Sequence, residues 1–178
     1  MLKIGYLGPE GTYSSYAARL YDKENLKIPF NTINEVLNSL KSSDANQVIV
    51  PLENSINGSI VEVLDFLASK NNFQIIAELN IEINHSIYSL DKINPVNVEV
   101  VYSHPQALAQ CYDYLVKNFK NAKHKASNST ADSYNDLVNS NEKGVFIGPP
   151  WMKEQDDIIV MGENIQSVKN NVTRFVVI

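Results

Sequence analysis

Three polar segments of the sequence directly follow apolar runs, and a fourth lies inside one. The segments are GPEGTYS at 8–14, PLENSING at 51–58, SHPQALAQC at 103–111 and NVTRF at 171–175. They are rich in hydroxyl and amide side chains, which together can bind a carboxylate. Because α/β sheets place their ligands beyond the ends of strands, these segments hold the candidate functional residues.

Each of the first two segments allows two interpretations. Segment 8–14 opens a helix, so its N–H groups can hold an anion, but a tight turn with an N-cap also explains it. Taken alone, this segment favours the turn. Segment 51–58 is either a ligand-binding loop or a strand-to-helix loop capped by Ser or Asn, and its spacing supports both equally.

The third segment places two amides on one helix face. Gln106 and Gln110 are four residues apart, near the start of a helix that Pro105 is suited to begin. With Ser103 at the preceding strand end, they can grip a carboxylate with the help of the helix dipole. The alternative is a capping serine followed by two surface glutamines.

Arg174 is one of only two arginines in the chain, the other being Arg19. It stands in an otherwise apolar strand, and a buried arginine needs a carboxylate partner from the ligand or from the protein. The alternative to a ligand role is an ion pair with an acidic residue of the chain.

Other reactive residue types give weaker indications. His85 can titrate near neutral pH, but a hydrogen-bonded structural histidine is the favoured interpretation. The single cysteine, Cys111, excludes an internal disulfide framework and a Cys-based zinc site. No set of His, Asp and Glu has the spacing of metal ligands, so the sequence predicts no metal site.

Short apolar runs alternate with amphipathic stretches, which predicts an α/β fold. We expect strands at 4–7, 48–52, 73–83, 85–90, 98–102, 145–147, 158–161 and 172–178. Helices are expected after Thr12, Thr32, Gly58, His104 and Thr130, and the fourth has an apolar stripe that reaches Phe119.

The chain ends in the apolar run 175–178, and a terminal strand of this kind pairs with an earlier segment. The first lobe is therefore expected to be discontinuous, formed by residues 1–78 and 163–178. Residues 79–162 would form the second lobe. We expect a ligand to bind in a cleft between the two lobes.

Composition excludes several classes of protein. The 178 residues are 44% hydrophobic and 20% charged, with a net charge of −5, which argues against binding to nucleic acid. No apolar run approaches the roughly 18 residues that cross a bilayer, and no signal-peptide core follows the first residues. The sequence predicts a soluble, cytoplasmic protein without a membrane partner.

In this order and spacing, the four segments resemble prephenate dehydratase, a family of phenylalanine biosynthesis. Ser129-Thr130-Ala131 and Asn164-Ile165 also match. The resemblance implies conversion of prephenate to phenylpyruvate, water and carbon dioxide without a metal or an organic cofactor. It further implies two α/β lobes like a type II periplasmic binding protein, a ligand cleft between them, and a homodimer.

The resemblance also implies roles for single residues. Thr173 would donate a proton to the leaving hydroxyl, and Arg174 would bind the pyruvyl carboxylate or brace Thr173. Uncharged donors suit the carboxylate that leaves, because an ion pair would stabilise the ground state more than the transition state. Catalytic roles fall to Thr173, Arg174, Ser103 and Asn54. Substrate contacts fall to Thr12, Ser14, Glu53, Ser55, Gln106, Gln110, Ser129, Thr130 and Phe175; Glu53 alternatively orients Asn54 or closes an ion pair.

Some features depart from the family's usual pattern. Segment 145–163 lacks the usual alanine-rich strand, and Gln166 stands where an acidic residue is common. The family usually continues after the Thr-Arg-Phe motif into an ACT regulatory domain, so we expect a stand-alone catalytic unit or a piece of a longer chain, without feedback inhibition by phenylalanine. Two alternatives stay open: an arogenate dehydratase, and a non-catalytic binding module of the same fold.

Overall fold

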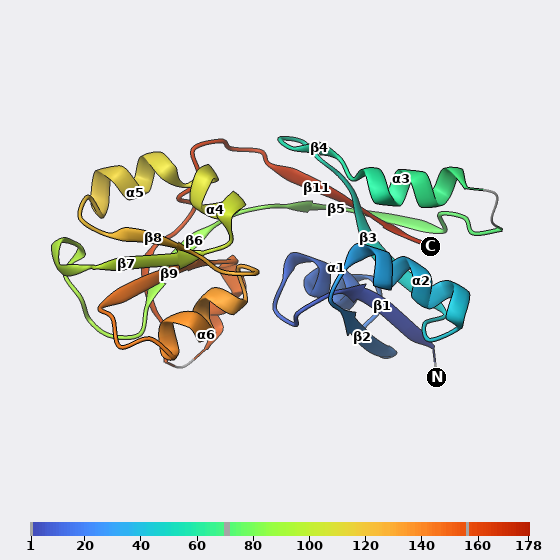
Figure 1. The fold of residues 1–178 in the computed structure, drawn as a ribbon, viewed down its shortest axis with the longest axis horizontal. Helices are drawn as coiled ribbons and strands as arrows, with labels where there is room; N and C mark the ends of the chain where they lie inside the picture. Colours follow the sequence, from blue (N-terminus) through green and yellow to red (C-terminus); the bar gives the residue numbers. More distant parts are fainter. Residues whose placement is uncertain (1, 70–71, 156) are drawn as a thin grey trace. The chain divides into compact units, whose positions relative to one another are not determined.

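The computed structural model describes residues 2–69, 72–155 and 157–178, and the chain divides into two units (Figure 1). Unit 1 comprises residues 1–83 and 170–178, and unit 2 comprises residues 84–169. The borders predicted from the sequence lie a few residues earlier, after 78 and after 162. Each unit has its own sheet and its own hydrophobic core.

Unit 1 is a six-stranded sheet with helices on both faces. Its strands are β1 (Lys3–Leu7), β2 (Leu26–Phe30), β3 (Gln47–Asn54), β4 (Gly58–Ser59), β5 (Ala77–Glu82) and β11 (Val172–Val177). Its helices are α1 (Tyr13–Tyr21), α2 (Ile33–Ser42) and α3 (Val61–Ala68). Thr12 and Thr32 cap α1 and α2 by accepting from Ser15 N and Glu35 N, which confirms both predicted helix starts.

The strand order of unit 1 brings the ends of three strands, β1, β3 and β11, together at one end of the sheet, which we call the unit 1 edge. The order is β2-β1-β3-β11-β5, in which β1, β2 and β3 are parallel and β11 runs antiparallel to β3 and β5. The carboxyl ends of β1 and β3 therefore meet the amino end of β11. Along β11, Phe175 packs on the α1 side of the sheet and Val176 on the α2 and α3 side, as the alternation of a strand requires.

Unit 2 is a five-stranded sheet in the order β10-β6-β9-β7-β8. Its strands are β6 (Ser86–Ser89), β7 (Val100–Ser103), β8 (Lys123–Ala126), β9 (Gly144–Gly148) and β10 (Ile159–Gly162). Its helices are α4 (Pro105–Gln110), α5 (Tyr112–Asn118) and α6 (Asp132–Val138), with 3-10 turns at Pro95–Asn97 and Pro150–Glu154. Because β7 and β8 are parallel to β9 and β6 is antiparallel to it, the carboxyl ends of three strands meet the amino end of β6.

The α/β class is confirmed, whereas some elements differ from the prediction. The helix expected to reach Phe119 breaks at Cys111 (φ −104°, ψ 8°) into α4 and α5. Its buried stripe is formed by residues four apart, such as Cys111 and Leu115, whereas the neighbouring Tyr112 and Val116 are exposed. Strands β2 and β8 were not predicted.

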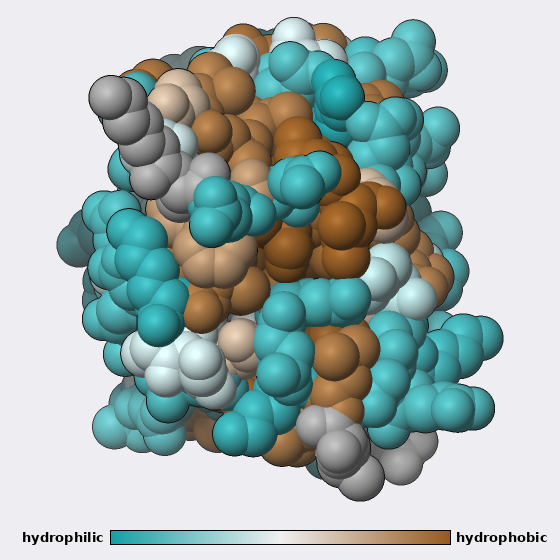
Figure 2. Space-filling view, turned by 90° about the vertical axis from the view of Figure 1, so that its right-hand side faces the viewer, coloured by the Kyte–Doolittle hydropathy of each residue, from teal (hydrophilic) through white to brown (hydrophobic). Residues whose placement is uncertain are grey.

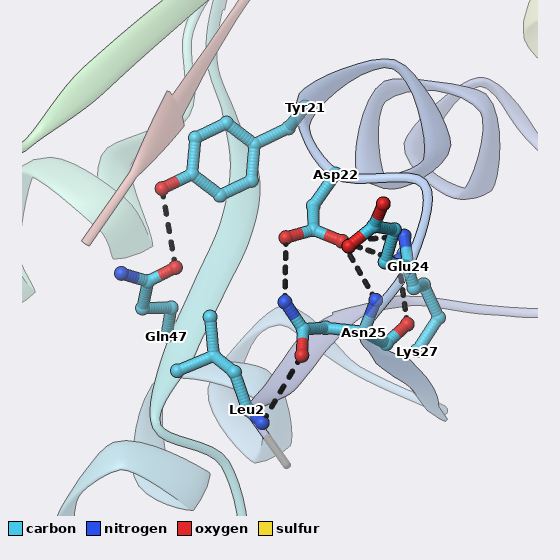
Figure 3. A network of polar contacts seen from close by, with 7 residues as sticks. All are labelled: Leu2, Tyr21, Asp22, Glu24, Asn25, Lys27 and Gln47. Carbon is cyan, nitrogen blue, oxygen red and sulfur yellow. Dashed lines mark hydrogen bonds and ion pairs between the residues drawn. The ribbon is translucent and has the colours of Figure 1, made fainter.

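The far edge of the unit 1 sheet is closed by a structural polar network (Figure 3). Asp22 accepts from Asn25 N (2.8 Å), Asn25 Nδ2 (2.8 Å) and Lys27 Nζ (3.1 Å), and Asn25 Oδ1 accepts from Leu2 N (3.2 Å). The hydrogen bonds from Asn25 and Lys27 lower the pKa of Asp22. This network ties the end of α1 to the starts of β1 and β2.

Apolar side chains are also found at the surface. Figure 2 shows a broad apolar area, crossed by a few polar residues, on one face of the molecule. Exposed large apolar residues of unit 1 include Leu64, Ile75 and Ile76. Within the described part of the chain, no helix combines the length and the apolar character needed to cross a membrane.

Candidate active site

Asn54 stands at the end of β3, where the chain turns back into β4. Its Oδ1 accepts from Ile56 N (3.0 Å), Asn57 N (3.1 Å) and Asn57 Nδ2 (2.9 Å), so the side chain closes the turn. Gly58 follows with φ +80°, a left-handed conformation that favours glycine. Segment 51–58 is thus a hairpin rather than the strand-to-helix loop considered from the sequence, and Ile60, before α3, makes no side-chain cap.

The same Asn54 amide reaches across to β11. Its Nδ2 donates to Thr173 Oγ1 (2.9 Å) and to Asn171 Oδ1 (2.7 Å). Asn54 and Thr173 are register partners, and cross-strand partners share one face of a sheet. Thr173 is only 8% exposed and accepts in this bond, and no described residue accepts its own hydroxyl hydrogen. The Thr173 hydroxyl therefore keeps a hydrogen to donate.

Ser55 fastens the start of β11 to the hairpin. Its Oγ accepts from Val172 N (2.9 Å), and its own N–H donates to Val172 O (2.9 Å). Together with the bond from Asn54, these contacts fix the register of β11 against β3, and with it the position of Thr173. Ser55 is exposed, so its side chain remains within reach of a ligand.

Arg174 lies on the opposite face of the sheet from Thr173, because successive strand residues alternate. Its Nε and Nη2 donate to Glu78 Oε2 (2.9 and 2.7 Å), and its Nη1 contacts Glu53 Oε1 at 3.4 Å. The hydrogen bond and charge of Glu78, and then those of Glu53, raise the pKa of Arg174. Of the alternatives left open by the sequence, the structure shows the ion pair, with a side chain that is 39% exposed rather than buried.

The turn after β1 lies at the same sheet edge. Thr12 Oγ1 accepts from Ser15 N (3.2 Å) and donates to Pro9 O (2.9 Å), so its hydroxyl closes the turn and caps α1. Ser14 is buried at 7% exposure. Phe175 is 2% exposed in the core on the α1 side, where it supports the strand that carries Thr173.

The polar edge of unit 2 is built differently. Ser103, at the end of β7, is fully buried, and its Oγ donates to Ile147 O (3.0 Å). Ser133 Oγ donates to the same carbonyl oxygen (3.0 Å). Both hydroxyls thus connect the end of β9 to neighbouring elements.

The two glutamines of α4 are not equivalent. Gln110 Oε1 lies 2.9 Å from His85 Nε2, whereas Gln106 is exposed. Burial lowers the pKa of His85, against the opposing effect of the Gln110 hydrogen bond, so this histidine is neutral at pH 7. Gln166 accepts from His85 N (2.9 Å) and donates to Asn84 Oδ1 (2.7 Å), joining the two segments that lead into and out of unit 2.

Ser129 and Thr130 precede α6 at the same edge. Ser129 Oγ accepts from Asp132 N (2.9 Å) and donates to Asp132 Oδ2 (2.9 Å), a capping arrangement of the kind expected there. Thr130 contributes its carbonyl oxygen to Ser133 Oγ (2.6 Å). Over residues 2–69, 72–155 and 157–178, no group of three His, Cys, Asp or Glu is arranged to hold a metal ion.

Comparison with known proteins bears directly on these two edges. The sequence model of the prephenate dehydratase family matches residues 4–178. The chain belongs to the prephenate dehydratase family. All of the candidate residues described above lie inside the matched range.

Relatives with assigned names agree with this membership. The bifunctional chorismate mutase/prephenate dehydratase of Buchnera aphidicola subsp. Schizaphis graminum is 35% identical over 183 residues, covering 100% of this chain and 47% of the relative. The prephenate dehydratase of Methanocaldococcus jannaschii is 34% identical, covering 97% and 63%. The chain therefore spans about half to two thirds of the length of these prephenate dehydratases.

Solved structures of prephenate dehydratases share the fold. The Arthrobacter aurescens structure, in complex with L-Phe, has a TM-score of 0.86 at 26% identity and covers 99% of this chain and 59% of that one. The Staphylococcus aureus structure has a TM-score of 0.80 at 29% identity, covering 99% and 65%. Each of these two structures matches residues of both unit 1 and unit 2.

Three residues of the unit 1 edge were not among the candidate site residues. Asn57 and Asn171 bond to Asn54, and Glu78 holds Arg174. The Asn57-Gly58 pair is a hairpin signal that was available in the sequence. The contacts of Asn171 and Glu78 depend on strand pairing between distant segments, which no local pattern reveals.

Proposed function

We propose that this chain catalyses the prephenate dehydratase reaction. One prephenate dianion and one proton give phenylpyruvate, carbon dioxide and water. The observation that carries the proposal is the 2.9 Å bond in which Asn54 Nδ2 donates to Thr173 Oγ1, since it leaves the threonine hydrogen for the substrate. Membership of the family supplies the class of substrate.

Proton delivery is the step that this geometry serves. As the C–O bond to the leaving hydroxyl breaks, Thr173 passes its hydrogen to that oxygen and water departs. The negative charge that develops on Thr173 Oγ1 is stabilised by Asn54 Nδ2, in the manner of an oxyanion-hole donor. Loss of the ring carboxylate as carbon dioxide supplies the electron pair that completes the aromatic ring, and solvent returns a proton to Thr173.

The surroundings of Thr173 suit a carboxylate that becomes neutral. Asn54 and Ser55 are uncharged, so they do not stabilise the ground-state anion as an ion pair would. Arg174 faces away from Thr173 and is engaged by two glutamates, so we assign it to positioning β11 rather than to the substrate.

The polar edge of unit 2, taken by itself, is suited to hold a carboxylate. We propose that its uncharged groups make this contact, in particular the exposed Gln106 amide and the part-exposed Gln110 and Thr130. Ser103 and Ser129 hold the local backbone in place. Ser103 Oγ donates to Ile147 O, and Ser129 Oγ accepts from Asp132 N at the start of α6. Neutral His85 adds no charge to this edge.

Turnover of prephenate by wild type, Thr173→Ala and Thr173→Ser tests the proposal. General acid catalysis typically contributes about 10²- to 10⁴-fold, so we expect a kcat loss in that range for Thr173→Ala and a much smaller loss for Thr173→Ser. A blank without protein is needed, since prephenate aromatises spontaneously in acid. Near-full turnover by a folded Thr173→Ala would remove the acid role, and faster turnover of arogenate in the same assay would change the substrate.

We further infer that the protein works in the cytoplasm as a homodimer. The apolar area of Figure 2 and the exposed Ile75 and Ile76 support a second copy as the partner, because large exposed apolar areas mark protein–protein interfaces. Sedimentation of wild type and Ile76→Lys tests this. A dimeric wild type and a more dissociated variant are expected, and a monomeric wild type would contradict it.

A further inference from the structure

The hydrogen bonds of the Asn54 side chain favour one amide orientation over the other. Two backbone N–H groups, of Ile56 and Asn57, point at the atom assigned as Oδ1, and neither can accept a hydrogen bond. The opposite orientation would place NH₂ hydrogens against both of them. The network therefore fixes which Asn54 atom faces Thr173, as amide assignment requires.

Two further asparagines stabilise that orientation from opposite ends. Asn57 Nδ2 adds a third donor to Asn54 Oδ1 at 2.9 Å. Asn171 Oδ1 accepts one Nδ2 hydrogen at 2.7 Å, and the other is directed at Thr173 Oγ1 at 2.9 Å, with Val172 O a more distant acceptor at 3.4 Å. Donors on the oxygen and an acceptor on the nitrogen polarise the amide in the same direction.

This orientation decides what the Thr173 hydroxyl does. If Asn54 presented its oxygen, Thr173 would donate to Asn54 and its hydrogen would be used inside the protein. With Nδ2 presented, Thr173 Oγ1 accepts and its hydrogen is directed elsewhere. The three asparagines therefore set the direction of the hydrogen bond on the residue that donates the proton.

We propose that Asn57 and Asn171 are positioning residues that act through Asn54 to keep the Thr173 hydroxyl a donor to the substrate. The inference rests on the proposed function for its readout in kcat. Asn171 is 3% exposed and its carbonyl also accepts from Ile83 N (2.7 Å), so the residue holds the edges of β11 and β5 as well.

Asn171 is tested by removing and then restoring its acceptor. Asn171→Leu is expected to lower kcat about tenfold with KM within about twofold, because one neutral hydrogen bond is lost away from the substrate. Asn171→Asp keeps an acceptor for Asn54 Nδ2 and is expected to recover most of kcat. Equal losses in both variants, or a loss carried by KM, would overturn the role of Asn171.

Asn57 is exposed, so its variants will fold, and they give a pH-dependent signature. In Asn57→Asp, an ionised carboxylate cannot donate to Asn54 Oδ1 and repels it, which favours the reversed amide. The kcat ratio of variant to wild type is expected to be about fivefold low at pH 8 and to rise toward one as the pH approaches about 4, where an aspartate protonates. A ratio that does not change with pH would contradict the proposal.

Asn38→Asp is the matched control, since Asn38 is an exposed asparagine on α2 of the same unit. It introduces the same charge far from Asn54, and its kcat ratio is expected to stay near one at every pH. A parallel pH dependence in this control would assign the effect to net charge and overturn the inference.

A readout without substrate separates this inference from the proposed function. Solvent exchange of the Asn54 side-chain NH₂ hydrogens, followed by NMR, is expected to be slow in wild type and about tenfold or more faster in Asn171→Leu. Slow exchange with no turnover of prephenate would reject the function and retain the network. Turnover with unchanged kcat and unchanged exchange in the variants would reject the network and retain the function.

Discussion

The polar edges of the two units occupy the same kind of place and are built in opposite ways. Each lies where the carboxyl ends of parallel strands meet the amino end of an antiparallel one. At the unit 1 edge, Asn54 and Thr173 bond to each other through their side chains. At the unit 2 edge, the Ser103 and Ser133 hydroxyls both donate to a backbone carbonyl.

This difference shows that the location of a hydroxyl does not decide whether it can act as an acid. Thr173 accepts from an amide and so retains a hydrogen, while Ser103 gives its hydrogen to Ile147 O and is sealed from solvent. Burial lowers the pKa of His85, so this histidine adds no positive charge to the unit 2 edge at pH 7. Under the proposed function, the hydroxyl that can transfer a proton is therefore Thr173 of unit 1 rather than Ser103 of unit 2.

Asn54→Asp tests whether Thr173 needs a hydrogen-bond donor from Asn54. Of the variants discussed, it is expected to have the largest effect on kcat. The carboxylate can still accept from Ile56 N and Asn57 N, so the turn survives. It cannot donate to Thr173, which then gives its hydrogen to the carboxylate. Removing a donor of this kind costs about 10²- to 10³-fold in kcat, to be measured by steady-state turnover of prephenate.

Two results would count against this account of Asn54. Turnover within about threefold of wild type would mean that no donor to Thr173 is needed, since even one ordinary hydrogen bond is worth more. Loss of the cooperative thermal transition would mean that the turn, rather than the donor, was disrupted. Asn54→Ala, which removes both functions, provides the reference for the second case.

Ser103→Ala probes the other edge and is expected to act on stability instead of chemistry. The variant loses one buried hydrogen bond, which costs about 1 kcal/mol of the free energy of unfolding. Ser133 Oγ stays 3.0 Å from Ile147 O and can share its one hydrogen between that oxygen and Thr130 O, which limits the loss. Urea unfolding measures this loss, while kcat and KM should stay within about twofold; a hundredfold fall in kcat would place Ser103 in the chemistry after all.

Local patterns predicted most of the elements, because burial and capping leave marks within a few residues. The run at 48–52 became the buried part of β3, and Thr12 and Thr32 became helix caps. Strand β8 was not predicted, because all of its residues, Lys123–Ala126, are exposed and show no alternation of buried and exposed positions. Strand β2 contains Pro29 and is only partly buried, so it also lacked a clear pattern.

The candidate site was predictable as a set of segments but not as a set of contacts. Thr173 and Asn54 are 119 residues apart, and they meet because β3 and β11 pair with a register shift between Arg174 and Phe175. A shift of one residue along a strand changes the face on which each side chain lies. For that reason the sequence did not show that Asn54 and Thr173 share a face, whereas alternation within the predicted strand 172–178 already places Arg174 and Thr173 on opposite faces.

Arg174→Gln tests whether Arg174 contacts the substrate or only positions β11. Its expected effect on kcat is smaller than that of Asn54→Asp. The guanidinium sits in exposed ion pairs, which contribute little and are screened by salt, so kcat should fall no more than about fivefold with KM unchanged. Glu78→Gln is the matched variant, because it removes the charge of the carboxylate whose Oε2 accepts from both Nε and Nη2, and it should reproduce the same change in kinetics. A tenfold rise in KM for Arg174→Gln alone would show that the guanidinium binds a substrate carboxylate.

The smallest expected effect is the pH dependence that His85 gives to the stability of unit 2. Burial lowers the pKa of His85 in the folded chain, so below the usual histidine pKa of about 6.5 the unfolded chain binds a proton that the folded chain does not. Stability rises with pH wherever the unfolded state binds more protons, so the free energy of unfolding should fall as the pH drops below about 6.5. His104 shifts in the same direction through partial burial, so the contribution of His85 is the difference between wild type and His85→Gln in urea unfolding at pH 5, 6, 7 and 8. The same slope in both proteins would mean that His85 is equally basic folded and unfolded, and the unit 2 edge would then carry a charge near neutral pH.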